Sequence, residues 1–146
     1  MHISLAVIGK LKVPALRALY DEYTKRLEWK VSLQEFEGKY TRDHENELLL
    51  KAIQPSSYLI LLDEGGENFK SQDFATLLND IQLHHQGKVT FVIGGADGLT
   101  QEIKAKANKT ISFGRMTWPH QFVRVMLMEQ LYRAQQILKG HPYHRQ

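Results

Sequence analysis

Two kinds of hydrophobic pattern alternate along the chain. Short apolar or alternating runs are typical of β-strands, and longer stretches with apolar residues every three or four positions are typical of helices. Pro14 opens one helical stretch, and Thr41 and Ser71 precede two others as candidate N-caps. The predicted strands span residues 2–8, 31–36, 58–62, 89–93 and 110–113. The predicted helices span residues 14–28, 41–53, 72–85, 99–107 and 120–138.

The order of these elements predicts the fold class. Strands that alternate with helices are typical of an α/β domain with a mainly parallel sheet and helices on both faces. Residues 58–62 (YLILL) and 89–93 (VTFVI) are continuous apolar runs, as expected for strands that are buried on both faces. The chain has no internal repeat, low-complexity segment or linker, so we predict a single domain over residues 1–146.

The last predicted helix is unusually apolar. Within residues 122–138, eleven of seventeen residues are apolar, and at 100° per residue they cover most of the helix circumference. Such a helix is expected to be buried on more than one side. A second subunit or a central place in a monomer would each explain this, and in so short a chain we favour a homodimer.

Composition narrows the class of protein. The chain has 146 residues, 42% of them hydrophobic and 24% charged, which is ordinary for a globular domain. The absence of cysteine excludes a disulfide scaffold, cysteine catalysis and a cysteine-ligated metal. The N-terminal apolar run is short and lacks a cleavage site, and no run approaches the roughly 18 apolar residues of a membrane helix. We therefore expect a cytoplasmic protein that does not bind a membrane.

Charge is unevenly distributed along the sequence. Residues 1–97 carry 11 Lys/Arg and 14 Asp/Glu, a net charge of −3, whereas residues 98–146 carry 8 and 2, a net charge of +6. A basic C-terminal third is suited to a polyanion such as RNA, although a chance fluctuation over a mixed surface explains the numbers as well.

Three predicted loops follow the ends of buried strands, at residues 63–66, 94–98 and 114–119. In parallel α/β sheets the ligand crevice lies beyond the carboxyl ends of the strands, so these loops are expected to build one pocket. Gly94 and Gly95 permit positive φ and close approach of the backbone to a ligand, although a plain strand-to-helix turn is the simpler explanation. Neither the dinucleotide fingerprint nor the phosphate loop is present.

The segment 113–124 (FGRMTWPHQFVR) is unusually apolar for a loop. Its apolar side chains and backbone polar groups suit a flat heteroaromatic ring such as adenine. The alternative is a loop that packs on the core with Trp118 buried. His120 either caps the following helix or acts on a substrate.

The C-terminal tail gathers polar side chains. His141, Tyr143, His144 and Arg145 offer stacking on bases and binding to phosphate, unless the tail is simply frayed. Two histidines are too few for a zinc site, and we predict no metal. Other candidate acid–base groups are Asp63, Glu64, Asp97 and Glu129, but no paired-carboxylate or Ser-His-Asp spacing stands out.

Four segments resemble the ribosomal RNA large-subunit methyltransferase H family. They are LLDEGGENF (61–69), FVIGGADGL (91–99), SFGRMTWPHQFVRVMLMEQLYRA (112–134) and HPYHR (141–145). The resemblance is collinear over essentially the whole chain, and the long third segment combined with the tail is highly specific. It implies a SPOUT fold with a C-terminal trefoil knot, an obligate homodimer, and methylation of N3 of a pseudouridine in large-subunit ribosomal RNA.

The resemblance also implies roles for particular residues. An S-adenosyl-L-methionine cradle is expected at Leu62, Gly94, Phe113, Gly114, Arg115, Met116, Thr117 and Trp118. An RNA-facing or catalytic group is expected at His120, Arg124, Tyr143, His144 and Arg145. Arg115 places a charge in the cofactor loop.

The expected mechanism is alignment of an already electrophilic methyl group with the ring nitrogen, helped by a base that takes the N3 proton. His144 or His120 would take this proton, and Arg124 or Arg145 would stabilise the anion. Because the tail is short, it is suited to complete the partner subunit's site. The chain has no separate RNA-binding domain, so we expect assembled ribosomes as substrate. Methylation of transfer RNA, or a ribosome-binding role without turnover, are the alternatives.

Overall fold

The computed structural model describes residues 1–145, and Gln146 of the predicted tail lies outside the described residues. Within residues 1–145, five strands alternate with five helices. The strands are β1 (His2–Ile8), β2 (Lys30–Phe36), β3 (Tyr58–Asn68), β4 (Lys88–Ile93) and β5 (Lys109–Ser112). The helices are α1 (Pro14–Arg26), α2 (Arg42–Ala52), α3 (Ser71–His84), α4 (Gln101–Lys106) and α5 (His120–Leu138).

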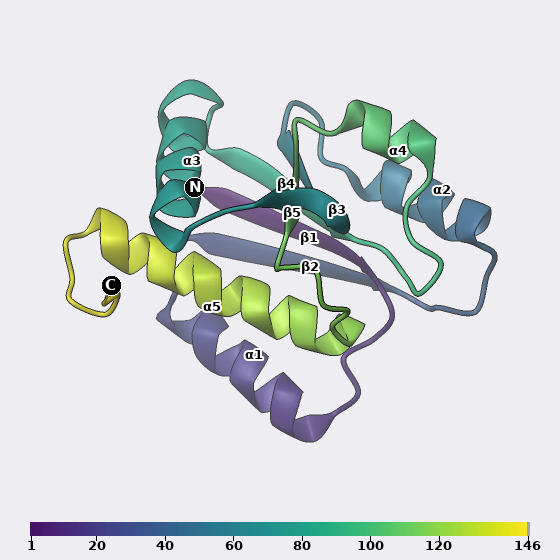
Figure 1. Ribbon diagram of the computed structural model, residues 1–146, viewed down its shortest axis with the longest axis horizontal. Helices are drawn as coiled ribbons and strands as arrows, with labels where there is room; N and C mark the ends of the chain where they lie inside the picture. Colours follow the sequence, from purple (N-terminus) through teal and green to yellow (C-terminus); the bar gives the residue numbers. More distant parts are fainter. Residues whose placement is uncertain (146) are drawn as a thin grey trace.

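The strands form one sheet in the order β2-β1-β4-β3-β5, and every pairing is parallel. The predicted mainly parallel sheet is therefore confirmed. Because the strands run the same way, β4 and β5 end at one edge of the sheet (Figure 1), and residues 62–64 of β3 lie at the same edge.

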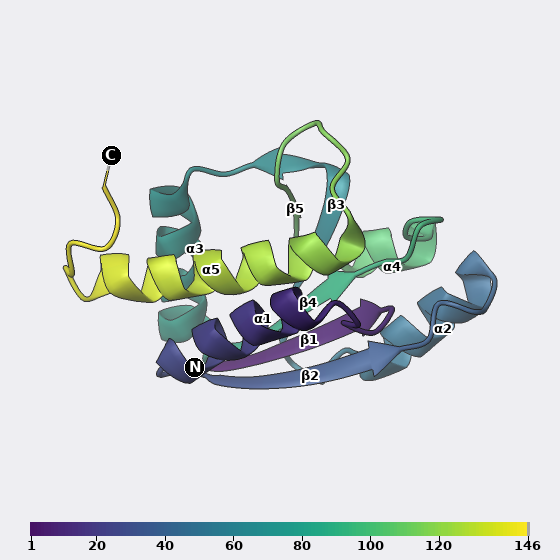
Figure 2. The same ribbon diagram turned by 90° about the horizontal axis from the view of Figure 1, so that it is seen from below.

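Helices cover both faces of the sheet, as predicted (Figure 2). On one face α1, α3 and α5 enclose a core that includes Leu5, Phe91 and Leu127. On the other face α2 and α4 pack on a smaller core that includes Leu49 and Ile103. In the described residues, no helix is long and apolar enough to cross a membrane.

Most boundaries agree with the sequence pattern to within two residues, and β1 and α5 agree at both ends. Thr41 caps α2 as predicted, because its side chain accepts a hydrogen bond from the His44 N–H at 3.2 Å. The cap predicted for α3 is wrong. Lys70 occupies the N-cap position, and the Ser71 hydroxyl instead donates to Oε1 of Gln130 at 2.8 Å.

Strand β3 is longer than its apolar run. It continues through Asn68, and its pairing with β5 shifts register between Leu62 and Glu67, both of which pair with Ile111. The predicted loop at residues 63–66 is therefore an irregularity inside a strand. An ideal Cβ on Gly66 would lie 2.7 Å from three backbone atoms of Thr110 and Ile111, so only glycine lets β3 approach β5 this closely.

Helix α5 lies against the sheet between α1 and α3, which accounts for much of its apolar surface (Figures 1 and 2). Leu127, Met128 and Leu131 are fully buried, whereas Phe122 and Leu138 are exposed. Packing inside one protomer therefore explains most of the apolar residues of α5. The apolar pattern alone does not require a homodimer.

Candidate functional site

Residues in the middle of β3 and the segments after β4 and β5 enclose one cavity of about 410 Å³. This volume lies within the roughly 300–1,000 Å³ of small-molecule sites. The predicted pocket at the carboxyl edge of the sheet is therefore present. Its walls are Leu62–Glu64 within β3, Ile93–Leu99 at and after the end of β4, and Ile111–Gly114, Met116–Trp118, His120 and Val123 from β5 to α5.

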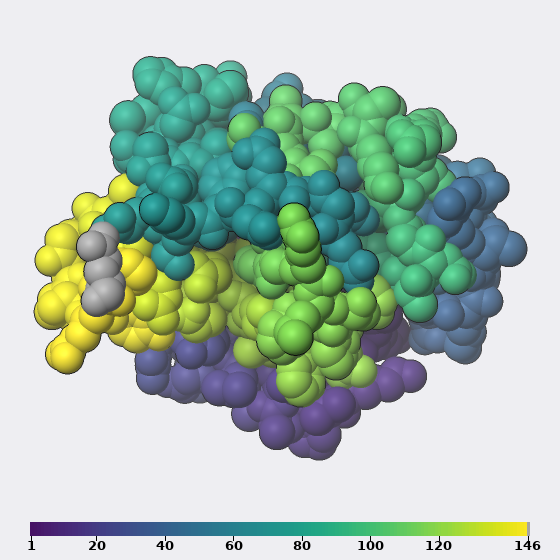
Figure 3. All heavy atoms as spheres, viewed as in Figure 1, coloured from purple at the N-terminus to yellow at the C-terminus, as the bar shows by residue number. Residues whose placement is uncertain are grey.

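Seven of the eight residues predicted to hold the cofactor line this cavity: Leu62, Gly94, Phe113, Gly114, Met116, Thr117 and Trp118. The eighth, Arg115, is exposed and is not part of the wall. The side chain of Arg115 therefore does not form part of the cavity wall. In the space-filling view the green segment around residues 110–120 stands out beside teal β3 (Figure 3).

Two side-chain hydrogen bonds shape the segment between β5 and α5. The Ser112 hydroxyl donates to the Gly114 carbonyl at 2.6 Å, and Trp118 Nε1 donates to the Phe113 carbonyl at 3.2 Å. Gly114 has a φ of +103°, which favours glycine. Trp118 keeps 39% of its surface exposed, so it is not the buried core residue that was the alternative.

The glycines after β4 are required for close packing. Neither Gly94 nor Gly95 has a positive φ, contrary to one expectation from the sequence, and Gly98 does. An ideal Cβ on Gly94 would lie 2.8 Å from the Leu99 side chain. One on Gly95 would lie 2.8 Å from Oε1 of Glu45. The segment can therefore fold back on itself, with the Gly98 N–H donating to the Gly95 carbonyl at 3.0 Å.

The cavity is acidic. Asp63, Glu64 and Asp97 are among its lining residues, and no Lys or Arg is. Beneath the glycine segment, burial raises the pKa of Glu45, and the nearby Asp97 raises it further. Such a site favours a ligand that carries positive charge. His120, at the first position of α5, is the one predicted catalytic residue that lines it. It makes no cap hydrogen bond, because Pro119 is the N-cap.

Arg124 was predicted to face RNA or act in catalysis, but the structure places it in the core with no exposed surface. Its guanidinium pairs with Glu35 at 2.5 Å and donates to the Gly9 carbonyl at 2.8 Å. In this arrangement Arg124 does not face a substrate, because its donors are directed into the protein.

The predicted tail residues lie at the opposite end of α5 from the cavity (Figure 1). A 19-residue helix is about 28 Å long, so Tyr143, His144 and Arg145 do not reach the cavity of their own protomer. The tail packs on α5. Tyr143 contacts the Tyr132 ring edge-on at 4.8 Å, and His144 Nδ1 lies 3.1 Å from Arg133 Nη1. Burial, followed by the charge of Glu129, raises the pKa of Tyr143 to about 12.

Three residues that the sequence pattern did not single out organise these parts. Arg133 joins Glu129 to His144 and lies over the Tyr143 ring at 5.0 Å. Glu35 and Gln121 bind the segment after β1. The spacing Glu129–Arg133 signals an ion pair on a helix, but Glu35 is 89 residues from its partner Arg124 and has no local signal.

The basic C-terminal third is partly neutralised by the fold. Lys109, Arg124 and Lys139 pair with Glu67, Glu35 and Glu28 of the acidic part. Sequence charge therefore overstates the free positive charge of this third. Among residues 1–145, no cluster of three or more His, Asp or Glu side chains is suited to hold a metal ion.

The sequence matches a known family and named relatives. Residues 1–144 match the family described as "Predicted SPOUT methyltransferase". The chain is 44% identical over 151 residues to "Ribosomal RNA large subunit methyltransferase H" of Rhodospirillum centenum, covering 99% of each chain. It is 40% identical over 159 residues to the protein of the same name from Clostridium botulinum, covering 99% of this chain and 100% of that one.

Solved structures share the fold at low sequence identity. A protein from Haemophilus influenzae assigned to a methylase family superposes with a TM-score of 0.60 at 13% identity, over 94% of this chain and 66% of that chain. A protein from Bacillus anthracis assigned as an RNA methyltransferase gives a TM-score of 0.50 at 12% identity, over 99% and 98%. At such identities the likeness concerns the fold alone.

Proposed function

The chain belongs to the ribosomal RNA large subunit methyltransferase H family of SPOUT methyltransferases, and we propose that it methylates large-subunit ribosomal RNA with S-adenosyl-L-methionine. The target is N3 of a pseudouridine, presented on assembled ribosomes in the cytoplasm. A C-terminal trefoil knot and a homodimer are part of this proposal. The observation that supports it best is the cavity in which the three strand-end segments meet.

The residues of the cavity fit the cofactor. Its volume of about 410 Å³ suits a nucleoside with a short amino-acid chain. Phe113, Met116 and Trp118 offer apolar surface for the adenine ring, and backbone groups of the same segment offer hydrogen bonds. Asp63, Glu64 and Asp97 complement the positive sulfonium and ammonium groups. The sulfonium supplies an electrophilic methyl group, so the chemistry requires no metal.

The protein must then orient the base and remove its N3 proton. His120 is placed for this at the cavity wall, at the start of α5. Positioning of the two reactants can contribute several kcal/mol, and a general base typically contributes about 10²–10⁴-fold. Arg145 is exposed and is available to stabilise the anion of the base or to bind phosphate. Arg124 does not take this role, because it is buried.

The position of the tail supports a composite site. Because Tyr143, His144 and Arg145 lie an α5 length from their own cavity, they act on the cavity of a partner protomer. Exposed Met116, Trp118 and Phe122 beside the cavity supply apolar surface for such contact. The His144→Ala variant should then lose methyl transfer while it still binds the cofactor.

Mixed dimers test this arrangement. A His144→Ala chain is combined by co-expression with a Gly94→Val chain, whose added side chain would collide with Leu99 and disable the cavity. If the tail serves the partner, mixed dimers keep one intact site, and about a quarter of the wild-type activity returns. If the tail serves its own protomer, no activity returns.

The function itself is tested by radiolabelled methyl transfer to ribosomes from a strain that lacks this gene, followed by digestion to locate the label. Label on a large-subunit pseudouridine supports the proposal. Label on transfer RNA instead, or efficient labelling of a protein-free RNA fragment, contradicts the substrate. Cofactor binding without transfer to any RNA contradicts enzymatic activity.

A further inference from the structure

A buried ion pair joins α5 to the segment that follows β1. Arg124 is the largest fully buried side chain of the described residues, and it lies one residue after Val123, which lines the cavity. Its Nη1 donates to Glu35 at the end of β2, and its Nη2 donates to the Gly9 carbonyl at the end of β1. Removing the Glu35 carboxylate would leave the Arg124 charge buried and without its ionic partner, which is strongly unfavourable.

Glu35 binds three groups from three parts of the chain. It accepts hydrogen bonds from the Leu11 N–H at 2.8 Å, from Arg17 of α1 at 3.3 Å and from Arg124. Burial opposes ionisation, but these donors together hold the pKa of the Glu35 carboxyl below its usual range. The carboxylate is therefore charged at neutral pH and acts as the centre of the cluster.

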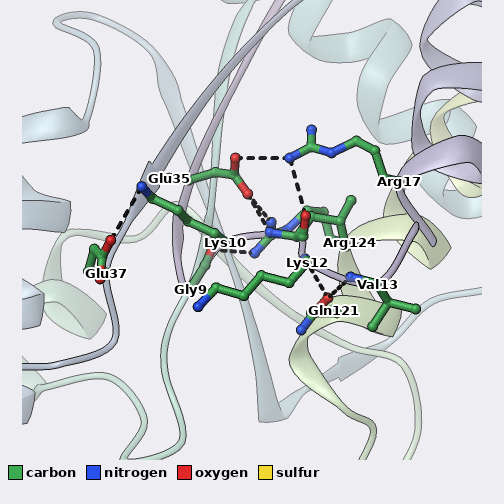
Figure 4. Close-up of polar contacts among 10 residues, drawn as sticks. Gly9, Lys10, Lys12, Val13, Arg17, Glu35, Glu37, Gln121 and Arg124 are labelled. Atoms are coloured by element: carbon green, nitrogen blue, oxygen red, sulfur yellow. Dashed lines mark hydrogen bonds and ion pairs between the residues drawn. The ribbon is translucent and has the colours of Figure 1, made fainter. Parts of the chain in front are cut away.

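Side chains of β2 and α5 bind several backbone groups of the segment 9–13 (Figure 4). In addition to the bonds at Gly9 and Leu11, Gln121 Oε1 accepts from the N–H groups of Lys12 at 3.0 Å and Val13 at 3.2 Å. Gln121 and Arg124 both belong to the first turns of α5. Three hydrogen bonds therefore join the segment directly to the start of α5, and two more join the segment and α5 to Glu35 of β2.

This cluster supports the cavity from two sides. His120 and Val123, in the same turns of α5 as Gln121 and Arg124, form part of the cavity wall. Ile8, next to the anchored Gly9, lies beneath the second wall, where its Cγ2 is 3.1 Å from an ideal Cβ of Gly95. A loosened ion pair would therefore let both walls move without any change in the lining residues.

We propose that Arg124 and Glu35 are positioning residues of the methyl-transfer site, which set the cofactor cavity by anchoring the start of α5 and the end of β1 to β2. This inference rests on the proposed function for its kinetic test. In this proposal Arg124 does not contact RNA. It acts by holding His120 and Val123 in place at the start of α5. A buried arginine is suited to this role because its planar fork makes several directed hydrogen bonds at once.

The test uses Glu35→Gln, Arg124→Lys and Arg124→Met in the full chain. Calorimetry measures the dissociation constant of S-adenosyl-L-methionine, and ribosome methylation gives KM and kcat. We expect Glu35→Gln and Arg124→Met each to weaken cofactor binding by roughly tenfold, with KM for the cofactor raised more than KM for ribosomes. Arg124→Lys, which keeps the charge but loses the fork, should fall between them and wild type.

The matched control is Ile81→Ala in α3, which truncates a fully buried side chain that does not line the cavity. It destabilises the fold by a cavity in the core but should keep the wild-type cofactor affinity. If Glu35→Gln lowers the melting temperature as Ile81→Ala does and leaves cofactor affinity unchanged, the pair is merely structural. If Arg124→Lys loses kcat alone while Glu35→Gln is normal, Arg124 acts directly on the substrate.

A second measurement is independent of the proposed function. Hydrogen exchange of backbone amides should accelerate over residues 9–13 and 120–124 in Glu35→Gln relative to Ile81→Ala. Equal exchange of these segments in the two variants would overturn the inference even if wild type bound no S-adenosyl-L-methionine. Failure of wild type to bind it, with the expected exchange pattern, would instead count against the proposed function.

Discussion

Substitution of Gly66 by alanine should disrupt the junction of β3 and β5. An ideal Cβ at this position would lie 2.7 Å from the N and C atoms of Ile111 and from the C atom of Thr110. These are backbone atoms of β5, which cannot rotate away as a side chain can. The strand must therefore shift by several tenths of an ångström or more, and the segment 113–118 that follows it forms a wall of the cavity.

The magnitude follows from the cost of overpacking, which is typically about 1–3 kcal/mol. For a domain of this size each kcal/mol lowers the melting temperature by about 2–4 °C, so we expect a fall of about 2–12 °C. Cofactor affinity should fall as well, because β5 positions Phe113 and Gly114. Thermal unfolding followed by circular dichroism and calorimetric titration with S-adenosyl-L-methionine measure the two effects.

The neighbouring Gly65 provides the control. An ideal Cβ there would meet only the end of the Asp63 side chain, at 3.2 Å, and that side chain can move. Gly65→Ala should therefore stay close to wild type in melting temperature and affinity. If Gly66→Ala matches Gly65→Ala in both measurements, the close approach of β3 to β5 does not constrain the fold, and the argument from packing is refuted.

Three further predictions follow from the site and its surroundings. Trp118→Ala should weaken cofactor binding about tenfold or more in calorimetry, because it removes apolar surface from the cavity wall, and unchanged affinity would exclude Trp118 from the cofactor site. Glu45→Gln should raise the melting temperature at pH 7, because the raised pKa of Glu45 means that its ionised form is disfavoured in the fold. The increase in melting temperature should become smaller as pH falls through the folded-state pKa of Glu45. An increase that does not depend on pH would contradict the raised pKa. The ionised Glu35 carboxylate stabilises the fold, because its pKa is lower in the folded protein than in the unfolded chain. This stabilisation is fully present above the usual carboxyl pKa of about 4 and is lost as pH falls through the folded-state pKa. Melting curves from pH 7 to pH 3 should therefore decline less steeply for Glu35→Gln than for wild type, and parallel curves would contradict the shift.

Local patterns in the sequence determined the elements and the place of the pocket, and the family resemblance indicated most of the residues that line it. The continuous apolar runs at residues 58–62 and 89–93 indicated buried strands, and their alternation with helical patterns predicted the parallel sheet. Because parallel strands end at one edge of the sheet, one pocket was expected there, and the cavity lies at that edge. The eight individual cofactor residues were expected from the family resemblance, and seven of them line the cavity. Motifs of this kind are short-range, so the chain sequence carries them directly.

The tertiary structure alone decided the places of Arg124, Gly66 and the tail. Arg124 belongs to a motif from which we expected a charge that faces RNA. In the structure it lies in the core, where it pairs with Glu35, 89 residues away in the sequence. Gly66 reads as part of a loop, yet the backbone of β5 requires it. The tail lies near the cavity in sequence, and the rigid length of α5 separates the two in space. Each outcome depends on contacts between distant segments, whose pairing is set by sheet order and helix length and leaves no periodic signal in the chain.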